Sequence, residues 1–146
     1  MQNPEILTMV AREWLLPSFA SGVVAFLLGV LWYHPKMLGT KWLEARGSSH
    51  SAPSFVSSQF IVTLPLWLIT SLFFTFMVHY FNISNPTEFF LLACLLWVAF
   101  AMPPIVMGSL YTGYPFNAVA IDAAYQLGGY YAIALVQYLF ILSSHT

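Results

Sequence analysis

One acidic residue stands inside a long apolar stretch of the chain. Asp122 lies in the sequence AVAIDAAYQLGG, and it is the only aspartate among 146 residues. If this stretch is a helix, Gln126 and Gln137 fall within about 60° of Asp122 around its axis. An ionised carboxylate in hydrocarbon costs about 2.5–3.5 kcal/mol, so Asp122 must face protein or water, or remain protonated. These three residues suit a polar path for an ion, a proton or a small solute.

A structural role for Asp122 is the alternative. Asn117 is expected to cap this helix, which puts Asp122 about 7 to 8 Å inside it, too deep to be a cap itself. In this interpretation Asp122 accepts a hydrogen bond from a tyrosine, a tryptophan or a loop amide and pins the first loop to the helices. The candidate partners at this depth are Tyr33, His34, Lys36, Lys41, Tyr111, Asn117 and Tyr125. In the path interpretation, His34 would titrate nearby.

The elements that must position these residues are membrane-spanning helices. Hydrophobic residues make up 60% of the chain and charged residues only 6%, whereas a soluble domain carries roughly 25% charge. Four segments are long enough to cross a bilayer of about 30 Å as helices, and none keeps the alternation of a membrane β-strand. They cover residues 14–33, 55–78, 89–111 and 118–142. We therefore predict an all-α polytopic membrane protein, a single four-helix transmembrane bundle over residues 1–146.

The segment 34–54 is the only long hydrophilic piece. Its first half mixes Trp42 and other apolar residues with charged ones, which predicts a short helix in the headgroup region. Lys36, Lys41 and Arg46 lie in this segment, and Arg12 is alone on the opposite side of the first helix. The positive-inside rule then places the first loop in the cytoplasm and both termini outside. We expect the protein in a membrane, specifically the inner membrane of a bacterium.

Small residues recur at helical spacing in two of the predicted helices. In the fourth helix they form a smooth ridge, and the first helix has a shorter series. A tight contact between the two series, within one subunit or between copies, is the natural expectation, and we predict a homo-oligomer. The helix-packing residues are Ser21, Ala25 and Gly29 in the first helix and Ala120, Ala124, Gly128 and Ala132 in the fourth.

Two stretches resemble a known family. The first is GVLWYHPKMLGTKW, with its aromatic residues, Pro35 and Gly39, and the second is MGSLYTGYPFNAVAIDAAYQLGG. Together they resemble domain-of-unknown-function family 1761, small integral membrane proteins found mostly in bacteria. The resemblance implies a multi-pass helical fold and no established activity, and His34 and Lys41 depart from its pattern. The residues that carry it are Trp32, Tyr33, Pro35, Gly39 and Trp42 in the first stretch and Gly108, Tyr111, Pro115, Asp122 and Tyr125 in the second.

Physical chemistry accounts for the first of these stretches. Trp32 and Tyr33 suit the aromatic belt at the membrane interface, and Pro35 ends the first helix. Gly39 permits a turn, after which Trp42 anchors the chain again at headgroup depth.

Other kinds of chemistry find little support in the sequence. The four histidines are scattered, no pair has a spacing of four, and Cys94 is the only cysteine. There is no phosphate-binding glycine loop, no Gly-x-Ser-x-Gly motif and no basic stripe for nucleic acid. We therefore predict no metal, no cofactor and no nucleic-acid partner.

Three functions remain open. The favoured one is a membrane assembly or interaction module, a homo-oligomer or a partner of another membrane protein. The second is a small channel or transporter with Asp122 in its path. The third is a lipid-modifying enzyme, which needs a second acid or base near Asp122, and His34, Glu44 and the tyrosines are the residues that could supply it. An enzyme is the least favoured of the three.

Overall fold

The computed structural model contains four long helical spans connected by short segments. It describes residues 4–47 and 58–144, with the backbone alone for residues 58–60. No strand occurs in these ranges, and each span is long and apolar enough to cross a membrane, which confirms the predicted all-α architecture. The spans are α1 (Pro4–Val10), η1 (Ala11–Leu15) and α2 (Leu16–Trp32); α4 (Ser58–Tyr80); α5 (Pro86–Leu96), η3 (Trp97–Ala101) and α6 (Met102–Thr112); and α7 (Phe116–Ser144).

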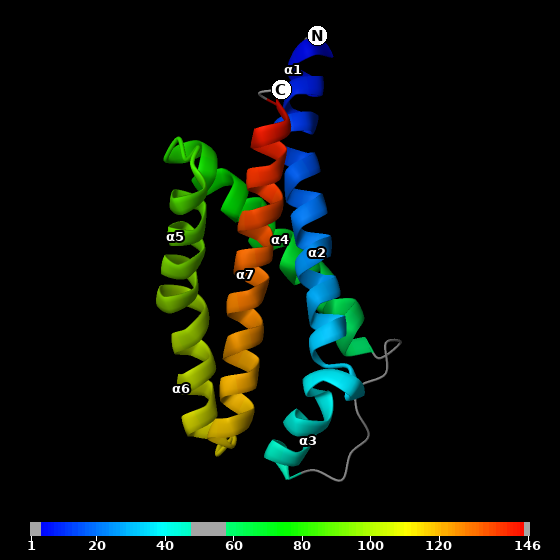
Figure 1. The fold of residues 1–146 in the computed structure, drawn as a ribbon, viewed down its shortest axis with the longest axis vertical. Helices are drawn as coiled ribbons and strands as arrows, with labels where there is room; N and C mark the ends of the chain where they lie inside the picture. Colours follow the sequence, from blue (N-terminus) through cyan, green and yellow to red (C-terminus); the bar gives the residue numbers. More distant parts are fainter. Residues whose placement is uncertain (1–3, 48–57, 145–146) are drawn as a thin grey trace.

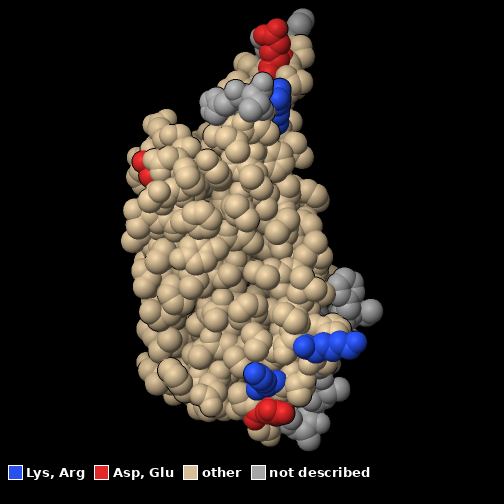
Figure 2. Space-filling model, viewed as in Figure 1, with Lys and Arg blue, Asp and Glu red and all other residues tan. Residues whose placement is uncertain are grey.

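The first connection contains two further short elements. The turn η2 (Pro35–Gly39), whose backbone is not helical at Met37, follows the first span, and α3 (Thr40–Arg46) follows η2. Both termini lie at one end of the bundle and α3 lies at the other (Figure 1). We call these the terminal end and the loop end. Lysine, arginine, aspartate and glutamate gather at the two ends of the face in Figure 2, and the area between them is free of these residues.

The first span begins earlier than the sequence predicted. Its helix starts at Pro4 rather than near Trp14 and includes Arg12 and Glu13 in the turn η1. Over 29 residues it is about 43 Å long, which exceeds the roughly 30 Å of a hydrocarbon core. The helix α1 extends beyond the bundle at the terminal end and has no buried residue (Figure 1).

The central helices of the bundle are α2 and α7. The helix α2 packs against α4 and α7, while α5 packs against the other side of α7 (Figure 1). The paired prolines of the third span stand in the first turn of α6, directly after the π-helical turn η3. In that turn, Trp97 donates a hydrogen bond from Nε1 to the Ala123 carbonyl of α7 at 2.9 Å. The third span is thereby fixed to α7 at the point where its helix changes form.

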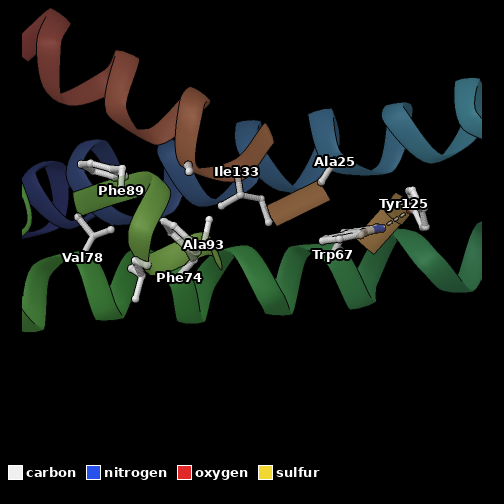
Figure 3. Packing of buried hydrophobic residues seen from close by; sticks show 10 residues of the cluster. Ala25, Trp67, Phe74, Val78, Phe89, Ala93, Tyr125 and Ile133 are labelled. Atoms are coloured by element: carbon white, nitrogen blue, oxygen red, sulfur yellow. Dashed lines mark hydrogen bonds between the residues drawn. The ribbon is translucent and has the colours of Figure 1, made fainter. Parts of the chain in front are cut away.

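Aromatic rings and small residues alternate in the buried core. Trp67 of α4 donates a hydrogen bond from Nε1 to the Tyr125 hydroxyl at 2.6 Å (Figure 3). A Cβ at Gly29 would overlap the Tyr125 ring, and a Cβ at Gly129 would overlap the Trp67 ring. Glycine is required at both positions because the rings occupy the space of a side chain. This packing fills the middle of the bundle between its two ends.

Candidate functional site

Asp122 is fixed by side chains from the first loop. Its Oδ1 accepts a hydrogen bond from the Tyr33 hydroxyl at 2.6 Å and another from Trp42 Nε1 at 2.8 Å. Tyr33 ends the first span and Trp42 lies on α3, so the two bonds connect three elements at the loop end. All three side chains are partly buried. Because both donors share one carboxyl oxygen of α7, this contact holds α3 against α7.

Two further residues complete the cluster around Asp122. The Arg46 guanidinium lies over the rings of Trp42 and Tyr114, at 4.5 and 5.5 Å from their centroids. The Tyr114 hydroxyl also interacts with the Asp122 carboxylate. Burial, and then the nearby Asp122 charge, raise the pKa of Tyr114 to about 12, so the hydroxyl keeps its proton at neutral pH. We call the group Tyr33, Trp42, Arg46, Tyr114 and Asp122 the Asp122 latch.

The turn η2 brings Trp42 to the latch. His34 has an extended backbone, and its Nδ1 accepts a hydrogen bond from the Lys36 amide at 3.2 Å. The Gly39 amide donates to the His34 carbonyl, and a Cβ at Gly39 would overlap the Tyr33 carbonyl. A side chain at position 39 would therefore open the turn that directs the chain back to α7.

The remaining residues of the predicted polar group lie elsewhere. Gln126 is partly buried outside the latch, and His34, Lys41 and Asn117 are exposed. Asn117 lies within the first turn of α7 rather than before it, because that helix already begins after Pro115. Tyr125 pairs with Trp67 in the core. The structure thus brings together Tyr33, Trp42 and Asp122 from the residues that the sequence singled out.

Gln137 belongs to a second polar cluster, about 22 Å along α7 from Asp122. Its Nε2 donates to Ser21 Oγ at 3.1 Å and to the Ser71 carbonyl at 3.2 Å. Hydroxyl contacts join Ser21 to Ser71 at 2.6 Å and Ser18 to Thr75 at 2.7 Å. All five side chains are buried, and they tie α2, α4 and α7 together near the terminal end. We call this group the serine cluster.

The sequence contains a signal for the serine cluster that the hydropathy pattern does not reveal. Ser18 and Ser21 are three residues apart, and Ser71 and Thr75 are four apart. Each pair therefore lies on one helix face, where hydroxyls can bond across to a neighbouring helix. The corresponding signal for Arg46 and Tyr114 is absent, because their contact depends on how the first loop folds.

The small residues of the two central helices differ in burial and in the residues that they contact. Ser21, Ala25 and Gly29 of α2 are buried inside the chain, where Gly29 meets Tyr125 and Ser21 meets Gln137. On α7, by contrast, Ala120 and Ala124 are exposed and Ala132 is only partly buried. At Gly128 a Cβ would lie 3.2 Å from Leu28 Cδ2. Within one chain, the α2 series therefore packs mainly against residues outside the predicted α7 ridge.

A cavity of about 660 Å³ opens at the terminal end. Its walls come from η1 and the start of α2, the end of α4 and the connection after it, and the end of α7. Of its lining residues, Thr75 and Gln137 of the serine cluster are buried, whereas Arg12 and Glu13 are exposed. Asp122 and Gln126 are not among its lining residues. Within residues 4–47 and 58–144, no three histidine, cysteine, aspartate or glutamate side chains are grouped to hold a metal.

These features define a four-span helical membrane protein with a hydrogen-bonded latch at one end and a half-polar cavity at the other. The family model for proteins of unknown function, DUF1761, matches residues 16–138. The chain therefore belongs to the DUF1761 family, as its two sequence stretches indicated. No curated protein and no solved structure matches it.

Proposed function

We propose that this protein is an oligomeric membrane assembly module whose copies associate through the outer face of α7. The outer face is the exposed side of that helix, a stripe about 100° wide. Its members are Ala120, Ala124, Leu135, Leu139 and Leu142. The same face suits another membrane protein that presents small residues. We further propose the inner membrane of a bacterium as its location, with the first loop in the cytoplasm.

The observation that carries this proposal is the exposure of two alanines four residues apart. Ala120 and Ala124 face outward at the loop half of α7, where no other helix of the chain's described part covers them. Small residues at this spacing let two helix backbones approach closely, which favours association in lipid. Tyr131, whose ring contacts Phe90 of α5, interrupts the stripe. Beyond it, the exposed leucines form a second patch on the same side and would extend the contact by van der Waals packing.

The geometry around Asp122 favours this function over the two alternatives. Tyr33 and Trp42 both donate to one carboxylate oxygen, as expected of a side chain that fixes a loop. A path through Asp122 and Gln137 would have to cross the packed contact between Trp67 and Tyr125. A lipid-modifying site would need a second acid or base beside Asp122 that is free to act on a substrate. His34 and Glu44 are exposed, and the hydroxyls of Tyr33 and Tyr114 are already engaged with the Asp122 carboxyl group.

Cysteine crosslinking in native membranes tests the proposal. In a Cys94→Ala background, Ala124→Cys should give a covalent dimer with a short bifunctional thiol reagent. Leu66→Cys is the matched control, since Leu66 is exposed on α4 at a similar distance from the loop end. Ala124→Leu should weaken association by about 1–3 kcal/mol, because extra methylene groups overpack a close helix contact. Equal crosslinking at both positions, or none at Ala124→Cys in folded protein, contradicts the proposal.

A further inference from the structure

The cavity at the terminal end has the volume of a small-molecule site. Its volume of about 660 Å³ lies within the range of roughly 300–1,000 Å³ that such sites occupy in proteins. Thr75 and Gln137 are its buried polar lining residues. Ser144, which also lines the cavity, is exposed and ends α7 seven residues after Gln137, about 10 Å along the helix axis. The two buried residues therefore define an inner end of the cavity.

The two buried side chains are close enough to meet one small molecule. Thr75 Oγ1 donates a hydrogen bond to the Ser71 carbonyl at 3.0 Å, and Gln137 Nε2 donates to the same oxygen at 3.2 Å. Because both atoms contact one oxygen, they lie no more than about 6 Å apart. Pro17, another buried lining residue, is joined to them through Ser21, whose hydroxyl donates to the Pro17 carbonyl. These contacts place the inner end on α2, α4 and α7.

Gln137 contributes a hydrogen-bond acceptor to the inner end. The Ser71 carbonyl can only accept a hydrogen bond, so the amide atom 3.2 Å from it must be Nε2. The hydrogen bonds that Gln137 makes with the described residues all use Nε2, and Oε1 takes part in none of them. A molecule that donates a hydrogen bond can therefore satisfy Oε1, whereas a molecule that only accepts hydrogen bonds cannot.

Apolar side chains adjoin this polar inner end. Phe140 and Ile141 follow Gln137 by three and four residues, and Val78 follows Thr75 by three. All three apolar residues line the cavity. Side chains at these spacings are neighbours on one helix face, about 5–6 Å apart between their Cβ atoms. A molecule with its polar group at the inner end would therefore place its body against hydrocarbon.

The charged lining residues of the cavity are exposed. These residues are Arg12 and Glu13. His79 also lines the cavity, but its ring stacks on Trp14 with centroids 4.5 Å apart, and its Nε2 lies 3.3 Å from the Glu13 carbonyl. A charged group at the inner end would lack a buried counter-charge among the described lining residues, and burial of an unpaired charge is costly. The inner end therefore suits a neutral group.

From these features we infer that the cavity binds a small neutral alcohol with a hydrocarbon body. The hydroxyl group donates a hydrogen bond to Gln137 Oε1. The hydrocarbon body packs against Val78, Phe140 and Ile141. A ketone of the same shape can only accept hydrogen bonds and leaves Oε1 unpaired. This inference is independent of association through α7.

Two uncharged probes with the same six-membered ring test the need for a donor. Cyclohexanol carries a hydroxyl group, whereas cyclohexanone carries only an acceptor. The purified full-length protein is titrated with each probe in the same detergent, and the shift in Tm with concentration gives the apparent affinity. Cyclohexanol should bind about tenfold more tightly, because the ketone leaves a buried acceptor unpaired. Equal affinity of the two probes, or no stabilisation by either, overturns the inference.

Three variants locate the binding at the cavity. Ile141→Trp fills its apolar part and should abolish the stabilisation by cyclohexanol. Leu91→Trp adds the same ring at an exposed position of α5 outside the cavity and should keep the wild-type affinity, which controls for effects of the probes on the detergent. Gln137→Met removes the acceptor and should bind both probes equally; if it does not fold, the tryptophan pair decides. Equal stabilisation of the two tryptophan variants, or a preference for cyclohexanol that persists in folded Gln137→Met, contradicts the inference.

Discussion

Two tryptophans of the loop end have opposite hydrogen-bonding states. Trp42 donates its indole N–H to Asp122 at 2.8 Å. Trp32, ten residues earlier, has a buried Nε1 without a hydrogen-bond partner among the described residues. A buried donor that loses its partner costs about 1–3 kcal/mol, and the same penalty already applies to Trp32 in the native protein. Substitution of the two indoles by phenyl rings should therefore have unequal effects.

We predict that Trp42→Phe destabilises the protein by about 1–3 kcal/mol, because it removes a donor from the Asp122 carboxylate. Trp32→Phe should stay within about 1 kcal/mol of the wild type, since relief of the unpaired N–H offsets the smaller ring. Thermal unfolding of both variants in the same detergent measures the difference. A larger loss from Trp32→Phe would mean that its indole contributes by packing alone and that the bond from Trp42 contributes little.

The sequence allowed part of the latch to be predicted. An aspartate in an apolar helix requires a partner, and Tyr33 was among the candidates because it lies at the same depth. Arg46 and Tyr114 were not predicted, since their positions depend on the turn η2 and on the end of α6. The serine cluster was also missed, because serine and threonine are common in membrane helices and often bond only to their own backbone.

The short helix α3 is the element that depends most directly on the latch. It has no buried residue; Trp42 bonds to Asp122 of α7, and Arg46 lies over Tyr114 in the connection between α6 and α7. On the opposing side, Tyr33, Tyr114 and Asp122 are the titratable groups that face these two residues. A change in the charge of one of these groups should first affect the docking of α3 against α7.

We predict that stability falls as the pH rises from 10 to about 12. The folded protein raises the pKa of Tyr114 from 10.0 to about 12, so it holds the phenolic proton more tightly than the unfolded chain. The resulting stabilisation is complete below pH 10 and is lost as the pH rises through the pKa of Tyr114 in the folded protein. Thermal unfolding at half-unit pH steps measures the decline. Tyr114→Phe should decline less over this interval, and identical curves for variant and wild type would contradict the prediction.

The extents of the helices were less predictable than their number. Hydropathy located four spans because about 20 apolar residues are needed to cross a bilayer. It placed the start of the first span near Trp14, where the charges of Arg12 and Glu13 end the apolar run. A helix does not need to end where the membrane does, and neither residue breaks helical structure. The chain therefore stays helical back to Pro4.

At the scale of the whole molecule, the two clusters fasten opposite ends of one bundle. The serine cluster joins α2, α4 and α7 near the terminal end, and the latch joins α2, α3 and α7 near the loop end. Between them lie an apolar core and two further hydrogen bonds, from Trp67 to Tyr125 and from Trp97 to the Ala123 carbonyl. Four crossings return both termini to the same end, and three of the four lysine and arginine residues lie at the other (Figure 1).

This charge distribution predicts the orientation of the protein in the membrane. Lys36, Lys41 and Arg46 at the loop end should stay in the cytoplasm, because positively charged short loops are translocated poorly. In a Cys94→Ala background, Thr87→Cys reports on the terminal end and Glu44→Cys on the loop end, and both positions are exposed. A membrane-impermeant maleimide should label Thr87→Cys in intact bacterial spheroplasts and Glu44→Cys only after lysis. The reverse pattern would place the termini in the cytoplasm and, with them, the opening of the terminal-end cavity.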